Sequence, residues 1–227
     1  MELKAFIINC TLKKSPEVSN TQALVDKAVA LFEEQGVETE SLRFVDYNIA
    51  RGVTSDEGPG DDWPLVLEKI KACNIFVVAS PIWFGERAST TQQVIERLDG
   101  TYDEMDPETG QFPLYNKVAG VLVTGNEDGA HTVAGTTLFN LTHLGCTIPP
   151  NVDSYWVGPA GPGPSYIEAG GERHLYTNRT LRYMVNNTTY MARLLKAHPI
   201  PTNLSELTAE AKNESDTPHD LPHKLPG

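Results

Sequence analysis

Three segments of the chain carry the side chains that could bind a ligand. The first spans residues 9–21, follows a short apolar run, and leads into a helix that we expect to begin near Asn20. A helix start offers unpaired backbone N–H groups and the positive end of the helix dipole, so it attracts phosphate. Hydroxyl, amide and ammonium donors surround this start; they are Thr11, Lys13, Ser19, Asn20 and Thr21. The segment predicts a site for one terminal phosphate, although Ser19 or Asn20 would also suit a simple helix cap.

Two better-known phosphate-binding patterns are missing from the sequence. There is no G-x-x-x-x-G-K-[ST] segment, and the glycines of residues 158–163 run into Pro164 rather than into a helix. Asp46 follows the second expected strand, where a dinucleotide fold would bind ribose, but the glycines that admit a pyrophosphate are absent. A mononucleotide therefore fits the sequence better than a dinucleotide.

The second segment, residues 80–85, offers flat apolar side chains. We expect Pro81 to end strand pairing and Gly85 to permit a tight turn. Trp83 and Phe84 then provide surfaces on which a planar ring could pack, unless both side chains fill the core. The candidate residues of this segment are Pro81, Ile82, Trp83, Phe84 and Gly85.

The third segment, residues 124–131, combines glycines with polar side chains. Gly125 and Gly129 allow backbone N–H groups to approach a ligand, and Asn126 can hydrogen-bond the polar edge of a planar ring. The acidic residues here could instead be ordinary helix-start acids, and His131 a solvated imidazole. The candidate residues are Thr124, Gly125, Asn126, Glu127, Asp128 and Gly129.

The elements that position these segments alternate between strands and helices. Residues 5–8, 75–79 and 118–123 are continuous apolar runs, which is typical of parallel strands covered on both faces. Residues 39–45 and an apolar stretch ending at 157 complete five strands, and amphipathic helical periods lie between them. The alternation predicts a doubly wound α/β sheet with helices on both faces, which binds ligands at the carboxyl ends of its strands.

The chain continues beyond the fifth strand. Residues 158–171 form a loop rich in proline and glycine, and residues 181–195 have the period of an added helix. We therefore expect one domain over residues 1–198 and a tail over residues 199–227 that lies on the surface or on a partner subunit.

Composition excludes several classes of protein. The formal net charge of -12 opposes nucleic-acid binding, because that affinity depends on clustered lysine and arginine. No signal peptide and no run of about 20 apolar residues is evident, so we expect a cytoplasmic protein that does not bind membranes. Cys10, Cys73 and Cys146 lack the spacing of a disulfide framework, a metal site or an iron–sulfur site. If NADPH binds, a local positive patch must offset the net charge, and Lys13 and Arg87 are the candidates.

The three segments, in this order and on these strands, resemble the flavodoxin-like NAD(P)H-dependent FMN reductase family. The resemblance covers about residues 3 to 157. It implies a flavodoxin-like doubly wound five-stranded parallel sheet of strand order 2-1-3-4-5. It also implies that the first segment binds the FMN phosphate, that the second flanks the ring and ribityl chain, and that the third borders the isoalloxazine. Asn9-Cys10 stands where many members have Gly-Ser, and the phosphate loop is longer than the common form.

From this resemblance we expect an oxidoreductase in which NAD(P)H reduces FMN and the flavin passes electrons to a small acceptor, such as a quinone or free flavin. The flavin supplies the chemistry, so no catalytic side chain and no metal is expected. The resemblance also implies a homodimer or homotetramer. Two alternatives stay open: a flavodoxin-type electron carrier with an acidic docking face, and a nucleotide-binding or regulatory domain without flavin.

Overall fold

The computed structural model describes residues 2–159, 161 and 163–214 of the chain. Its parallel strands are β1 (Leu3–Asn9), β2 (Val37–Arg43), β3 (Ile75–Trp83), β5 (Val118–Thr124) and β6 (Asp153–Trp156). They lie in the order β2-β1-β3-β5-β6, and a short β4 (Glu86–Arg87) pairs antiparallel with β3. Counted along the chain, the parallel strands have the order 2-1-3-4-5 of flavodoxin-like sheets, so the predicted fold is confirmed.

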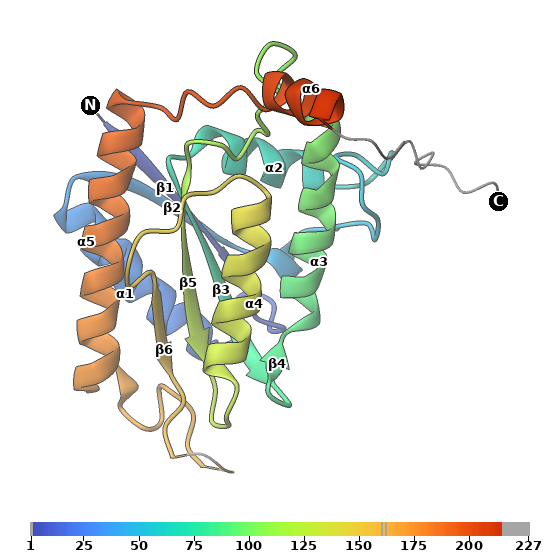
Figure 1. Cartoon of the computed structure of the whole chain (residues 1–227). Helices are drawn as coiled ribbons and strands as arrows, with labels where there is room; N and C mark the ends of the chain where they lie inside the picture. Colours follow the sequence, from blue (N-terminus) through green and yellow to red (C-terminus); the bar gives the residue numbers. More distant parts are fainter. Residues whose placement is uncertain (1, 160, 162, 215–227) are drawn as a thin grey trace.

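Helices cover both faces of the sheet (Figure 1). One face is covered by α1 (Asn20–Glu34) and α5 (Leu175–Ala197), and the other by α2 (Trp63–Ala72), α3 (Ser89–Leu98) and α4 (Ala130–His143). Along β1, Ala5 and Ile7 point into the first core, whereas Phe6 and Ile8 point into the second. This arrangement explains why the strands are apolar without alternation.

Strand β2 lies two residues earlier than the predicted residues 39–45. Gly36, with φ +73°, ends α1, and β2 begins at the next residue. It stops at Arg43, the partner of the last residue of β1, and Phe44–Asp46 forms a 3₁₀ turn instead. The strand therefore ends where its neighbour ends.

The prediction that Pro81 ends strand pairing was wrong. Strand β3 continues to Trp83, because Pro81 lies in register with Thr124 of β5 and the two following residues pair with β4. On its other side β3 pairs with β1 only as far as Ala79. The missing N–H of Pro81 therefore falls beyond the β1 ladder and interrupts no bond there.

Beyond α5 the chain forms a helix that the sequence did not predict, α6 (Leu204–Glu214). The N–H groups of Leu204 and Ser205 donate to the carbonyl of Thr109, and the rest of the helix is exposed. In Figure 1, α6 lies at the opposite end of the sheet from the loops that follow β5 and β6. Residues 215–227 of the predicted tail lie outside the described residues.

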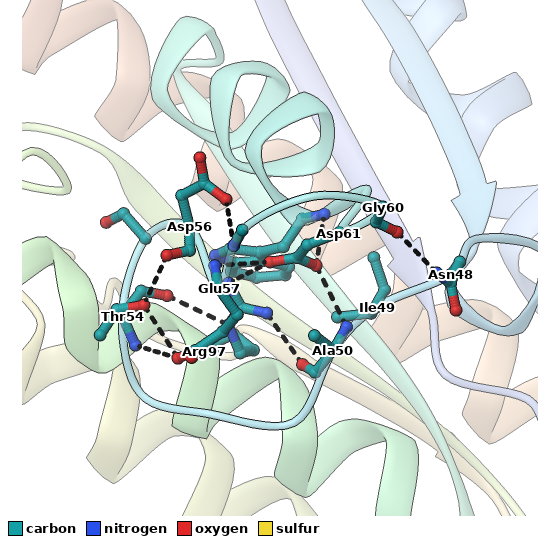
Figure 2. A network of polar contacts seen from close by, with 12 residues as sticks. Asn48, Ile49, Ala50, Thr54, Asp56, Glu57, Gly60, Asp61 and Arg97 are labelled. Carbon is teal, nitrogen blue, oxygen red and sulfur yellow. Dashed lines mark hydrogen bonds and ion pairs between the residues drawn. The ribbon is translucent and has the colours of Figure 1, made fainter.

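A buried arginine holds the loop between β2 and α2 (Figure 2). The guanidinium of Arg97, on α3, donates to the carbonyls of Ala50 (2.8 Å) and Thr54 (3.1 Å) and to Asp61 Oδ2 (2.7 Å). The side chains of both ion-pair partners are 0% exposed. Asp61 also accepts hydrogen bonds from three backbone N–H groups, those of Ala50, Glu57 and Trp63. One ion pair thus orders a long polar loop that has no helix or strand between residues 47 and 62.

We expect the ion pair between Arg97 and Asp61 to weaken in acid. Burial raises the pKa of Asp61, but the hydrogen bonds from Arg97 and the three N–H groups outweigh it and lower the pKa from 3.8 to about 2. Because the folded pKa lies below the unfolded one, the stabilisation is fully present above about pH 4 and is lost as the pH falls toward 2. At about 1.4 kcal/mol per pKa unit, it amounts to about 2 kcal/mol.

Urea unfolding between pH 2 and 6 tests this expectation when the protein is compared with its Asp61→Asn variant. The variant should lack the extra loss of unfolding free energy between about pH 4 and 2. An identical pH dependence in both proteins would show that Asp61 has its ordinary pKa.

Candidate functional site

The carboxyl ends of β1, β3 and β5 surround a hollow of about 370 Å³, a volume within the usual range of small-molecule sites. Leu12, which was not a candidate, lines it together with candidate residues from all three predicted segments. The candidates are Thr11, Lys13, Ser19, Asn20, Thr21, Pro81, Ile82, Trp83, Thr124, Gly125, Asn126 and Glu127. The structure therefore brings the three segments together at one place. Their roles in binding stay predictions.

The start of α1 forms the first wall of the hollow. Ser19 is the N-cap residue, and its hydroxyl accepts a hydrogen bond from the Gln22 N–H (3.2 Å). The N–H of Thr11 donates to Asn9 Oδ1 (3.0 Å), which turns the chain away from β1. Lys13 lies on the exposed part of this loop and adds a positive charge. Ser19 therefore caps the helix and also lines the hollow, so its role as a helix cap is compatible with a role in binding a ligand.

Two threonines that were predicted to serve opposite ends of a ligand are in contact. Thr21 Oγ1 and Thr124 Oγ1 lie 2.8 Å apart, and both side chains are buried. Each hydroxyl already has a partner in the protein. A substitution of Thr21 would therefore disturb Thr124 as well, and its effect on ligand binding could not be assigned to one end of the ligand.

The turn after β3 forms the second wall. Trp83 is 51% exposed and lines the hollow, whereas Phe84 is 93% exposed and does not, so neither side chain fills the core. Phe84 and Gly85 both have positive φ angles, 51° and 80°, which confirms the predicted tight turn. The N–H of Phe84 donates to Glu127 Oε1 (3.0 Å) and ties this turn to the third segment.

The predicted residues Phe84, Gly85, Asp128 and Gly129 are not part of the lining of the hollow. Asp128 and Gly129 instead border a neighbouring hollow beside His131, whose Nε2 lies 3.1 Å from the hydroxyl of Tyr155. A Cβ atom on Gly129 would lie 2.5 Å from the carbonyl oxygen of Gly85. The two turns therefore touch through their backbones, and their glycines permit this close approach.

Two wall residues, Ser165 and Tyr166, come from a segment to which the sequence assigned no role. They belong to the loop between β6 and α5, and we call residues 163–171 the strap. The side chain of Asn20 accepts a hydrogen bond from the Ile167 N–H (2.9 Å). The side chain of Asn126 donates to the carbonyl of Gly163 (2.9 Å). Two predicted ligand-binding side chains thus hold the strap over the hollow.

The charged residues considered for a dinucleotide lie in different places. Arg87 is partly buried and its guanidinium donates to Asn140 Oδ1 (2.6 Å) and to Gln92, so it holds α4 against the start of α3. Asp46 accepts hydrogen bonds from the N–H (2.9 Å) and hydroxyl (2.6 Å) of Ser15. Of the two basic candidates, Lys13 lines the hollow.

Comparison with known proteins identifies the family. The profile of the family described as NADPH-dependent FMN reductase matches residues 3–157. The 8-demethyl-8-aminoriboflavin-5'-phosphate synthase of Streptomyces davaonensis is 48% identical over 225 residues, which are 95% of this chain and 87% of that protein. A crystal structure of RosB with the bound intermediate 8-demethyl-8-formylriboflavin-5'-phosphate has a TM-score of 0.89 at 44% identity and covers 99% of this chain and 95% of that chain.

A third relative covers this chain but is much longer. A Mycobacterium bovis protein named divalent metal cation transporter MntH is 39% identical over 226 residues. These residues are 95% of this chain but only 33% of that protein. Within the described part of this chain, no helix has the length and apolar character needed to cross a membrane. The profile match covers more than half of the chain and includes the three segments that line the hollow, so the chain belongs to the NADPH-dependent FMN reductase family.

Proposed function

We propose that the hollow binds riboflavin 5'-phosphate and that the chain is an NAD(P)H-dependent oxidoreductase that passes electrons to a small acceptor. One observation carries this proposal. A helix start, a half-exposed indole and polar backbone and side-chain groups converge in a single hollow at the carboxyl ends of the strands. These are the groups that suit a phosphate, a planar apolar ring and the polar edge of that ring, respectively.

The residues around the hollow would hold FMN by its two ends. The N–H groups at the start of α1 and the ammonium group of Lys13 would bind the phosphate. Trp83 and Ile82 would pack against the ring, and the loop from Gly125 to Glu127 would meet its polar edge. Bound flavin supplies hydride and electron transfer, while the protein orients the ring and excludes water from it. The acceptor, the homo-oligomeric state and the cytoplasmic location stay predictions.

Absorption spectra test the proposal directly. The purified protein titrated with FMN should give a yellow one-to-one complex, and anaerobic NADPH or NADH should bleach its visible band on the timescale of turnover. A protein that binds no FMN would contradict the proposal. A protein that binds FMN but is not bleached by either nucleotide would not be an NAD(P)H-dependent oxidoreductase.

A second function is favoured by the full-length similarity to the Streptomyces davaonensis synthase. That protein is named for making a flavin 5'-phosphate with an altered position 8, and the similarity to it extends beyond residue 157. In this case the same hollow would bind FMN as a substrate. Mass spectrometry of the flavin recovered after incubation with oxygen as oxidant and an amino-group donor separates the two functions, because a cofactor returns with the mass of FMN and a modified substrate does not.

A further inference from the structure

The loop between β1 and α1 has little packing of its own. Residues 12–18 are all exposed, so packing in the core does not order them. The two ends of the loop nevertheless line the hollow, through residues 11–13 on one side and residues 19–21 on the other. Hydrogen bonds from other parts of the chain therefore give this loop its shape.

Arg43, the last residue of β2, forms the first of two attachments to the loop. Its Nη1 donates to the carbonyl of Glu17 (2.7 Å) and, at 3.5 Å, to that of Lys13. Its Nε donates to Gln22 Oε1 (3.2 Å), which also accepts a hydrogen bond from Asn9 Nδ2 (2.7 Å). One guanidinium group thus joins the loop to the first turn of α1 and, through Gln22, to the end of β1.

Asp46 forms the second attachment, three residues further along the chain. Its two carboxylate oxygens accept hydrogen bonds from the N–H (2.9 Å) and the hydroxyl (2.6 Å) of Ser15. Ser15 lies between Lys13 and Glu17, so the loop is held at its middle as well as on both sides of it. Neither Arg43 nor Asp46 lines the hollow. Both residues can therefore act on a ligand there only through the loop or through the field of their charges.

We propose that Arg43 and Asp46 are positioning residues for the phosphate of the bound flavin, because they hold residues 13–17 in the shape in which the loop and the start of α1 bind this group. The inference depends on the proposed function of the hollow. A loop that is ordered before the ligand arrives loses less conformational entropy on binding, which raises the affinity. Riboflavin lacks the phosphate, so the two attachments favour riboflavin 5'-phosphate over riboflavin.

The Arg43→Met variant keeps an apolar stem of similar length and removes the donors. In titrations that follow flavin fluorescence, the dissociation constant for FMN should rise about tenfold or more, while that for riboflavin stays within about twofold. Arg193→Met is the matched control, because Arg193 donates to the carbonyl of Gln35 (3.0 Å) at the opposite end of α1. This control should leave both dissociation constants unchanged. An equal loss for the two flavins in Arg43→Met, or no loss for FMN, would overturn the inference.

The Asp46→Ala variant separates positioning from charge. If the carboxylate acted on the ligand only through its field, its removal would take away a negative charge beside the loop and strengthen phosphate binding. Positioning predicts the opposite, a dissociation constant for FMN that rises about threefold or more, because Ser15 loses both of its acceptors. Asp106→Ala is the matched control, since Asp106 accepts hydrogen bonds from the N–H (2.8 Å) and the hydroxyl (2.9 Å) of Thr109 in another loop and does not line the hollow.

The outcomes of the Asp46→Ala titration are distinct. Weaker FMN binding in Asp46→Ala but not in its control would support the inference. Tighter or unchanged FMN binding in Asp46→Ala, or a loss of equal size in the control, would overturn it. If the unsubstituted protein binds no FMN, the proposed function of the hollow itself fails, and the inference fails with it.

Discussion

Replacing Arg97 with methionine should lower the free energy of unfolding by about 3 to 5 kcal/mol. The substitution preserves an apolar stem of similar length but removes the partner of the buried Asp61 carboxylate. It also leaves the carbonyls of Ala50 and Thr54 without the donors that Figure 2 shows. A buried charge without its partner is costly because the protein interior screens it poorly and offers no water to solvate it.

Urea unfolding at pH 7 measures this effect, with Arg173→Met as its control. The Arg173 side chain is 85% exposed and forms a surface ion pair with Glu172, so its replacement should change the unfolding free energy by no more than about 0.5 kcal/mol. The double variant Arg97→Met with Asp61→Leu should lose less than Arg97→Met alone, because it leaves no unpaired charge. A loss below about 1 kcal/mol in Arg97→Met would show that the ion pair does not hold the loop.

The sequence identified the loop between β2 and α2 but not the residue that orders it. Residues 46–62 are polar and rich in glycine, aspartate and serine, which indicates a loop, whereas Arg97 is 36 residues away from Asp61 along the chain. One signal was available, because Arg97 follows Val94 by three residues and precedes Leu98, which places it on the buried face of α3. An arginine at such a position needs a buried partner, but its spacing alone does not say which carboxylate provides it.

The three segments of the site could be predicted because parallel strands bring their carboxyl ends to the same edge of the sheet. Local rules were sufficient for the helix start at Asn20 and the turn at Gly85. The strap could not be found in this way, since it reaches Asn20 at the start of α1 through Ile167, from beyond β6 at the edge of the sheet. The only local sign was an aromatic residue in a loop of proline and glycine at the ligand-binding end.

Replacing Gly129 with alanine should destabilise the protein by about 3 kcal/mol or more and lower its affinity for FMN at least tenfold. Gly129 has φ +127°, where a side chain is strained, and its added Cβ would lie 2.5 Å from the oxygen and 2.6 Å from the Cα of Gly85. Both contacts are with backbone atoms, so no side-chain rotation can relieve them. The two turns must separate, which would break the bond between Phe84 and Glu127 and displace Trp83 from the wall of the hollow.

Gly135→Ala tests whether this effect comes from the contact between the turns rather than from the loss of a glycine near α4. Gly135 lies inside α4, and a Cβ there would meet no atom within 4 Å. Because alanine favours the helix over glycine by about 0.5 to 1 kcal/mol, this variant should be slightly more stable and should bind FMN as the unsubstituted protein does. Urea unfolding and FMN titration of both variants decide the matter. If Gly129→Ala kept full stability and affinity, the contact between the two turns would not position the ring-binding wall.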